Sequence, residues 1–362
     1  MLFENSFKDK TVLVTGHTGF KGSWLCIWLR ELGAQVVGYA LEPYTDRDNF
    51  VVTGLGGKIT HIVGDIRDYQ KLEKAFSENR PEFVFHLAAQ PIVRESYLKP
   101  KETFDSNIGG TVNVLECCRS TDSVKVIVNV TSDKCYENRE WVWGYRENDP
   151  MGGYDPYSSS KGCSELITKA YLKSFFNPDD FEAHRKCLSS ARAGNVIGGG
   201  DWQKYRLIPD CIKALEISQP VKVRNPMAIR PWQHVLETLN GYLTLANRMY
   251  REPETYFGAW NFGPDHDANI TVGAVVDKVV EQWGSGSWVN LSGRREPYEA
   301  ELLNLDISKA KSYLHWFPVW TVEKGIKKTV DWYKEYERED PYKICVSQIE
   351  EFQSETRGSQ DV

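Results

Sequence analysis

Residues 11 to 22 run Thr11-Val12-Leu13-Val14-Thr15-Gly16-His17-Thr18-Gly19-Phe20-Lys21-Gly22. A β-branched run stops at a glycine, and an apolar stretch then continues to Leu32 with Gly33 beyond it, which predicts a strand, a tight turn and a helix. Gly16 permits the turn, Gly19 lets the backbone approach a pyrophosphate at the helix N-terminus, and Gly22 allows the helix to pack closely on the strand. In this setting the spacing favours a dinucleotide-binding unit over an ordinary glycine turn.

Strands and helices alternate through the first half of the chain. Apolar runs predict further strands over residues 35–40, 58–63, 82–87 and 124–130. Helices are expected between them, over residues 69–77 and about 100–119. This alternation favours an α/β fold built on a Rossmann-type, doubly wound parallel sheet.

The length of 362 residues allows two unequal domains. We expect a mainly dinucleotide-binding Rossmann domain over residues 1–185, to which strands near 187–193 and 257–263 return. A smaller, mixed α/β domain over residues 195–345 would bind the substrate. Residues 346–362 are expected to form a C-terminal tail, and the polar stretch from residue 338 onward fits either a docked helix or a frayed end.

The composition argues against several classes of protein. The net charge of −6 disfavours nucleic acid as a partner. No apolar run approaches the ~20 residues of a membrane span, and residues 1–10 lack the apolar core of a signal peptide. None of the eight cysteines has Cys-x-x-Cys spacing, and the seven histidines show no metal-ligand spacing. We therefore expect a cytoplasmic protein with buried thiols, no metal, and no membrane or nucleic-acid partner.

The end of the second strand leaves the choice between NAD and NADP open. The acidic residue that usually holds a ribose 2′-OH directly after this strand is missing, and Glu42 comes three residues later than Tyr39. An arginine there would favour NADP, but Arg47 lies between Asp46 and Asp48.

Candidate cofactor residues also follow the third and fourth strands. Asp65 could accept a hydrogen bond from an adenine amino group or could cap the next helix, although Asp68 suits the cap well. The small residues of Leu87-Ala88-Ala89 would leave room for a nicotinamide. Asn107, in the next predicted helix, could contact the cofactor or equally bridge backbone groups.

Two later motifs carry chemistry. Tyr157-Ser158-Ser159-Ser160-Lys161 lies in a predicted helix, where a spacing of four puts the tyrosine and the lysine on one face. The ammonium would lower the tyrosine pKa from about 10, so that Tyr157 could take a proton from a sugar or alcohol hydroxyl near neutral pH. Thr131-Ser132-Asp133-Lys134 follows the strand that ends at residue 130. The glycine turn and these two motifs, in this order, are a stronger signal than any one of them.

With these motifs the chain resembles the extended short-chain dehydrogenase/reductase family. The resemblance reaches to about Pro318 and is carried by Gly16-x-x-Gly19-x-x-Gly22, Asp65-Ile66, Leu87-Ala88-Ala89, Asn107-Ile108-x-Gly110-Thr111, Tyr157-x-x-x-Lys161 and Arg192-x-x-Asn195. Within the family the chain is similar to the nucleotide-sugar 4,6-dehydratases. That similarity is carried by residues 16–24 and 131–134, by Asn195-Val196-Ile197-Gly198-Gly199-Gly200-Asp201-Trp202, and by Arg230-Pro231-Trp232-Gln233-His234-Val235.

The resemblance implies an NAD-dependent hydro-lyase of deoxysugar biosynthesis that converts CDP-glucose to CDP-4-keto-6-deoxyglucose and water. Tyr157 would remove the 4-OH proton while C4 loses hydride, and Lys161 would tune the tyrosine and hold the nicotinamide ribose. Ser132 would bind the 4-oxygen. Asp133 would protonate the departing 6-hydroxyl, which requires a raised pKa from partial burial; otherwise it is a turn or N-cap carboxylate.

Lys134 departs from the pattern, because many 4,6-dehydratases place a glutamate there as the base for the C5 proton. It would act either as a neutral base at C5 or as a cation that stabilises the C4 enolate while Tyr157 or a water moves the proton. Two other functions stay open. One is a nucleotide-sugar 4-epimerase, which needs no acid at C6, and the other is a non-catalytic NAD-sensing regulator.

The resemblance also assigns binding residues and an oligomer. Cofactor binding falls to Gly16, Thr18, Gly19, Phe20, Lys21, Gly22, Asp65, Ile66, Leu87, Ala88, Ala89, Asn107, Tyr157 and Lys161. Substrate binding falls to Gln90, Arg94, Asn195, Arg206, Arg230, Arg294 and Tyr298, because arginines suit a diphosphate and an aromatic ring can stack on a pyrimidine. A homodimer through the helices that carry Asn107 and Tyr157, or a tetramer, is expected.

Overall fold

The structure is a computed structural model that describes residues 2–265, 269–293 and 302–360. Its centre is a seven-stranded sheet with the order β11-β6-β5-β4-β1-β2-β3, in which every pair of neighbours is parallel. The strands are β1 (Thr11–Thr15), β2 (Gln35–Ala40), β3 (Thr60–Val63), β4 (Phe83–His86), β5 (Val126–Val130), β6 (Cys187–Ala193) and β11 (Gly258–Phe262). The inner strands are covered on both faces, which explains their near-continuous apolar runs.

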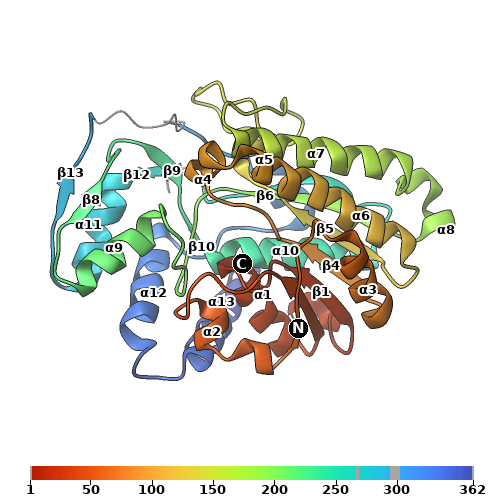
Figure 1. The fold of residues 1–362 in the computed structure, drawn as a ribbon, viewed down its shortest axis with the longest axis horizontal. Helices are drawn as coiled ribbons and strands as arrows, with labels where there is room; N and C mark the ends of the chain where they lie inside the picture. The colour runs from red at the N-terminus through yellow and green to blue at the C-terminus, as the bar shows by residue number, and fades with distance from the viewer. Residues whose placement is uncertain (1, 266–268, 294–301, 361–362) are drawn as a thin grey trace.

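Helices cover both faces of this sheet (Figure 1). One face carries α3 (Tyr69–Asn79), α6 (Gly110–Ser120) and α7 (Pro156–Ser174), which contribute to one apolar core. The other face carries α1 (Phe20–Glu31) and α10 (Val235–Arg251), and α12 (Val322–Glu335) joins their core. The predicted α/β, doubly wound Rossmann-type sheet is therefore confirmed. None of the helices in the described parts of the chain is long and apolar enough to cross a membrane.

The strand order changes direction between β1 and β4. The chain runs outward from β1 through β2 to β3, and then returns to place β4 on the other side of β1. In open parallel sheets, ligands bind in the crevice that this reversal opens at the carboxyl ends of the strands.

A smaller region lies beside the sheet, on the side of α9 (Leu207–Glu216) and α11 (Val272–Trp283) (Figure 1). It contains three strand pairs. They are β7 (Val196–Ile197) with β10 (Gln233–His234), β9 (Ile229–Pro231) with β12 (Asn269–Thr271), and β8 (Val221–Val223) with β13 (Trp288–Asn290).

The segment after β4 is less regular than predicted. The sequence suggested one helix over about 100–119, whereas the structure has α4 (Val93–Leu98), α5 (Pro100–Phe104), a π-helical turn at Asp105–Gly109, and then α6. Such turns widen the helix locally and often occur near functional sites. Asn107 lies in this turn, which matters for its role below.

The C-terminal stretch is a docked helix, α13 (Pro341–Gln360), packed against α1 and α12. The Phe352 ring lies 5.9 Å from that of Trp28 and 5.1 Å from that of Trp320. Ile349 is also buried, so the helix buries an apolar stripe. The boundary expected at residue 345 falls inside α13, and residues 346–360 belong to this helix rather than to a separate tail.

Candidate active site

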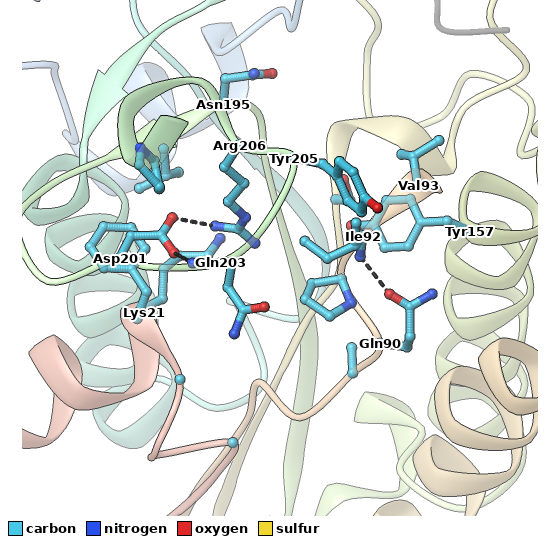
Figure 2. Close-up of a pocket in the computed structure, with 18 of the residues that line it drawn as sticks. Lys21, Gln90, Ile92, Val93, Tyr157, Asn195, Asp201, Gln203, Tyr205 and Arg206 are labelled. Carbon is cyan, nitrogen blue, oxygen red and sulfur yellow. Dashed lines mark hydrogen bonds and ion pairs between the residues drawn. The ribbon is translucent and has the colours of Figure 1, made fainter. Parts of the chain in front are cut away.

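A cavity of about 660 Å³ opens at the carboxyl ends of the strands, between the sheet and the smaller region. The glycine turn, the ends of β2 to β6, the start of α7 and residues of the smaller region all contribute to its wall. Figure 2 shows Lys21, Asp201 and Arg206 on one side of the cavity and Gln90, Ile92 and Tyr157 on the other. Apart from Asn107, Arg294 and Tyr298, the cavity brings together every residue that the sequence assigned to the site.

The glycine turn fits a dinucleotide. Gly16 has a φ of +74°, and a Cβ there would lie 2.8 Å from the backbone nitrogen of Ala88. A Cβ on Gly22 would lie 2.2 Å from the carbonyl oxygen of Gly16, so α1 can begin this close to β1 only with glycine. Gly19 caps α1 without a side-chain hydrogen bond, and no acidic residue lies in the first turn. The helix therefore presents backbone N–H groups to the cavity, as a pyrophosphate requires.

Asp65 and Arg67 follow β3 and also line the cavity. The Asp65 carboxylate accepts hydrogen bonds from the Arg67 backbone N–H (2.9 Å) and from its guanidinium (3.0 Å), and this pairing lowers the pKa of Asp65. Asp68 caps α3 by accepting from the Lys71 N–H at 3.1 Å. Asp68 is thus the helix cap, and Asp65 lines the cavity.

The arginine that could have favoured NADP points elsewhere. The Arg47 guanidinium pairs with Glu216 and lies 3.6 Å from the centroid of the Trp202 ring. Glu42, at the end of β2, does line the cavity. A carboxylate at this position accepts from a ribose hydroxyl and repels a 2′-phosphate, which favours NAD.

Asn107, which was expected at the cofactor, forms its hydrogen bonds within the protein. Its amide accepts from the Gln90 N–H (2.8 Å) and donates to the Gln90 carbonyl (3.1 Å) and to Ser160 Oγ (2.8 Å). Asn107 is not among the residues that line the described cavity. The second of the two roles foreseen, the bridging of backbone, is what it performs. The Gln90 side chain in turn accepts from the Ile92 N–H at 2.6 Å (Figure 2), which orders the cavity wall.

Tyr157 and Lys161 lie in the first turns of α7. Pro156 occupies the first position of the helix, and Asp155 caps it by accepting from the Ser158 N–H at 2.9 Å. Burial raises the pKa of Tyr157 to about 12; Asp133 adds to this, whereas a hydrogen bond with Ser132 and the charge of Arg206 oppose it. Burial lowers the pKa of Lys161 to about 8. The net pKa of Tyr157 is therefore raised and not lowered as expected, because desolvation outweighs the groups that oppose it.

Ser132, Asp133 and Lys134 form a tight turn after β5. Ser132 Oγ donates to Asp133 Oδ1 (3.0 Å) and accepts from the Lys134 N–H (3.2 Å). Asp133 is only 2% exposed, and its Oδ2 has no hydrogen-bond partner within the described ranges. A buried carboxyl oxygen without a partner is costly unless a ligand meets it. Lys134 is half-buried and lines the same cavity.

The predicted substrate residues are divided between the walls: Arg206 and Asn195 lie across the cavity from Gln90 and Tyr157 (Figure 2). Arg206 pairs with Asp201 at 3.0 Å, and the Arg94 guanidinium lies 5.4 Å from the centroid of the Tyr205 ring. Asn195 and Arg230 line the cavity as well. Arg294 and Tyr298 lie outside the described residues.

Comparison with known proteins supplies the family. Residues 13–329 match the model of the GDP-mannose 4,6-dehydratase family. The chain belongs to this family. It is 52% identical over 358 residues to the CDP-glucose 4,6-dehydratase of Salmonella typhimurium, a match that covers 98% of this chain and 99% of that one. The dTDP-glucose 4,6-dehydratase of Xanthomonas campestris is 26% identical, over 89% of this chain and 93% of that one.

Solved structures show the same fold. A dTDP-glucose 4,6-dehydratase from Bacillus anthracis in complex with NAD has a TM-score of 0.73 at 22% identity, covering 93% of this chain and 99% of that one. A UDP-glucose 4-epimerase from Thermotoga maritima with UDP-glucose has a TM-score of 0.77 at 22% identity, covering 91% and 100%. These likenesses show that the chain shares this fold.

Several residues of the cavity wall were not identified from the sequence. They are Asp201, Gln203, Tyr205, Asp210 and Arg224. Asp201 was visible as part of a glycine-rich motif, but Asp210 and Arg224 lie in an ordinary helix and after a short strand, where no local pattern marks them. Lys21, which was expected at the cofactor, lies 3.4 Å from the Tyr242 hydroxyl, and burial lowers its pKa to about 7.

Proposed function

We propose that this chain is a CDP-glucose 4,6-dehydratase, which converts CDP-glucose to CDP-4-keto-6-deoxyglucose and water. The observation that carries the proposal is Asp133, a buried carboxyl with one oxygen free for a ligand, in the same cavity as Tyr157 and Lys161. Loss of water from C6 needs an acid, whereas a 4-epimerase needs none. The 52% identity to a CDP-glucose 4,6-dehydratase over nearly the whole chain supports the substrate.

NAD is the cofactor of this activity, and the residues of the glycine turn would hold it. The N–H groups at the start of α1 would bind its pyrophosphate, and Asp65 and Glu42 lie where its adenosine half would lie. When bound, NAD accepts hydride from C4 of the sugar and later donates hydride to C6 of the sugar. Its oxidised nicotinamide ring carries a positive charge. Ala88 and Ala89 line the same cavity as Tyr157, and their small side chains would leave room for that ring.

Tyr157 acts as the base at the 4-hydroxyl, and its neighbours adjust it. A phenol with a pKa of about 12 is protonated at neutral pH, so it needs nearby cations to take a proton. Lys161, with a pKa of about 8, is mostly an ammonium at neutral pH and lies one helical turn from Tyr157. The Ser132 hydroxyl, which donates to Asp133 Oδ1 in this structure, would turn to donate to the 4-oxygen when the sugar is bound.

Asp133 and Lys134 act on the next carbons. The new ketone at C4 acidifies the C5 proton, and Asp133 protonates the 6-hydroxyl as it leaves. Lys134 faces the same cavity. As a neutral amine Lys134 would remove the C5 proton; as a cation it would stabilise the C4 enolate while Tyr157 or a water removes that proton. In either case the group that took the proton returns it to C5 as hydride adds to C6.

Two residues of the cavity wall support cytosine as the base of the substrate. Asp210 on α9 and Arg224 after β8 both line the cavity, and α9 packs on β8. Burial raises the pKa of Asp210, and Arg224 opposes that rise. A carboxylate accepts from the cytosine amino group, and a guanidinium donates to the neighbouring ring nitrogen or oxygen. Uracil and thymine present an oxygen in place of the amino group, which a carboxylate repels.

Asp210→Asn should therefore weaken the preference for cytosine over uracil. An amide can donate as well as accept, so the variant tolerates the uracil oxygen. We expect the ratio of kcat/KM for CDP-glucose over UDP-glucose to fall about ten- to hundredfold, the size of one good base contact. Steady-state kinetics with both sugars measures the ratio. An unchanged ratio would place base selection elsewhere.

The function itself is tested by substrate choice. We would incubate the pure protein with CDP-glucose, dTDP-glucose, UDP-glucose and GDP-mannose, with and without added NAD, and record the near-ultraviolet absorbance that 4-keto-6-deoxy sugars develop in alkali. We expect product from CDP-glucose at a rate well above that from the others. No absorbance from any sugar, with NAD bound, would sink the dehydratase proposal and favour the 4-epimerase.

We also propose a cytoplasmic location and a homodimer or tetramer. All eight cysteines are free thiols, as in a reducing compartment. Leu98 on α4 and Leu166 on α7 are 71% and 57% exposed, and these helices lie together on one face (Figure 1). A second copy docked on that face would cover them.

A further inference from the structure

A buried ion pair connects α7, the helix that carries Tyr157 and Lys161, to β6. Glu165 stands one helical turn after Lys161 on α7, and Arg192 lies in β6. Arg192 Nη2 and Glu165 Oε2 are 2.7 Å apart, and each side chain is 4% exposed. Neither side chain is among the residues that line the described cavity, and the mechanism above uses neither.

The carboxylate of this pair holds the start of the catalytic turn. Glu165 Oε1 accepts from the hydroxyl of Thr131, the residue immediately before Ser132. Glu165 Oε2 accepts from Ser190 Oγ at 2.7 Å and from Arg192. The backbone N–H of Thr131 also donates to the Ala191 carbonyl at 3.0 Å. The helix that carries Tyr157 and Lys161 is thereby tied to the residue from which the turn leaves β5.

The guanidinium of the pair holds the end of the same turn. Arg192 Nη1 donates to the Tyr136 hydroxyl at 2.7 Å and to the Glu147 carbonyl at 3.0 Å. Tyr136 directly follows the turn Asp133–Cys135, and its hydroxyl donates to Asn261 Oδ1 at 2.7 Å. Residues 132–135 therefore lie between two residues, 131 and 136, that both hydrogen-bond to the same ion pair.

We propose that Glu165 and Arg192 are positioning residues that set Ser132, Asp133 and Lys134 at the correct distance from Tyr157 and Lys161; the proposal rests on the dehydratase function. Stability alone does not account for the pair, because apolar residues of the same volume often replace a buried ion pair without loss. Charge-assisted hydrogen bonds in a dry interior are short and directional. Catalytic groups on two different elements need such a connection, since small misplacements of reacting groups slow catalysis strongly.

The same carboxylate also acts on Lys161. Burial lowers the pKa of Lys161, and the negative charge of Glu165 opposes that lowering, as does Cys135. His86 on β4 and Lys21 on α1 also face this ammonium. Removal of the Glu165 charge would let the Lys161 pKa fall further, so the high-pH limb of activity would move to lower pH. A pair that only stabilised the fold would leave that limb in place.

Two mild variants test the proposal without breaking the ion pair. Thr131→Val removes the hydroxyl that donates to Glu165, and Tyr136→Phe removes the hydroxyl that accepts from Arg192. We expect each to lower kcat about ten- to hundredfold, while the KM for CDP-glucose and the Kd for NAD change less than threefold. Glu165→Gln should lower kcat further and shift the high-pH limb downward, if it folds. Glu237→Gln is the control for a buried glutamate outside the cavity: Glu237 is 1% exposed and accepts from the Val319 N–H at 3.0 Å, and burial raises its pKa to about 8, so this variant controls for burial and not for loss of a charge.

The outcomes separate this proposal from the proposed function. If the unmodified protein makes product but Thr131→Val and Tyr136→Phe keep kcat within twofold, the positioning role is overturned. If the unmodified protein makes no product from any nucleotide sugar, the function fails first. Hydrogen exchange over residues 131–136 then decides the positioning proposal. We expect faster exchange of this segment in Thr131→Val than in the unmodified protein, and equal rates would overturn the proposal.

Discussion

Tyr157→Phe should lower kcat about 10²- to 10⁴-fold and leave NAD binding within about threefold, because the substitution removes one hydroxyl and no packing. The phenol oxygen is the group that takes the 4-OH proton. Phenylalanine keeps the ring at the start of α7, where Pro156 and the Asp155 cap fix the backbone. Single-turnover formation of the 4-keto sugar measures the chemical step, and titration with NAD measures binding.

A second tyrosine on the same helix provides the control. Tyr171 donates to Glu116 at 2.9 Å and does not line the described cavity, so Tyr171→Phe should keep kcat within about twofold. If Tyr157→Phe retained more than about a tenth of the activity, the base would have to be another group. A loss of NAD binding together with activity would instead indicate a structural role for Tyr157.

Asp133→Asn should separate the two halves of the reaction. An amide has the shape of the carboxyl but cannot protonate the departing 6-hydroxyl, so turnover should fall about 10²- to 10⁴-fold. Oxidation at C4 depends on Tyr157, Lys161 and Ser132, which the substitution leaves in place. We therefore expect the reduced cofactor and an unreleased 4-keto sugar to accumulate on the protein. The absorbance of reduced nicotinamide after addition of CDP-glucose measures the first, and borodeuteride trapping with mass spectrometry identifies the second.

The control for Asp133→Asn is again Glu237→Gln, a buried carboxyl outside the cavity, which should turn over normally. Near-normal product formation by Asp133→Asn would show that the acid at C6 is another residue. Failure to accumulate reduced cofactor, together with lost turnover, would show that Asp133 already acts before the elimination. Either result would require a different assignment of roles within the Ser132-Asp133-Lys134 turn.

Most of the secondary structure could be predicted because it depends on residues that are neighbours in the sequence. The strand over 187–193 and the glycine turn are set by local hydrophobic patterns and by the conformational freedom of Gly16, and the structure has both where they were expected. The π-helical turn around Asn107 was not predictable. It depends on hydrogen bonds to Gln90 and Ser160, which lie 17 and 53 residues away along the chain.

The sequence by itself determined the sheet, the dinucleotide turn and the candidate reacting groups, because spacing within one helix or one turn decides which side chains share a face. Only the tertiary structure decided how those groups are tuned and held. The pKa of Tyr157 is raised rather than lowered, since desolvation by burial outweighs the groups that oppose it. The Glu165–Arg192 pair joins a helix to a strand and anchors both ends of the catalytic turn. Such effects depend on which residues distant in sequence exclude water together, and that is settled by packing.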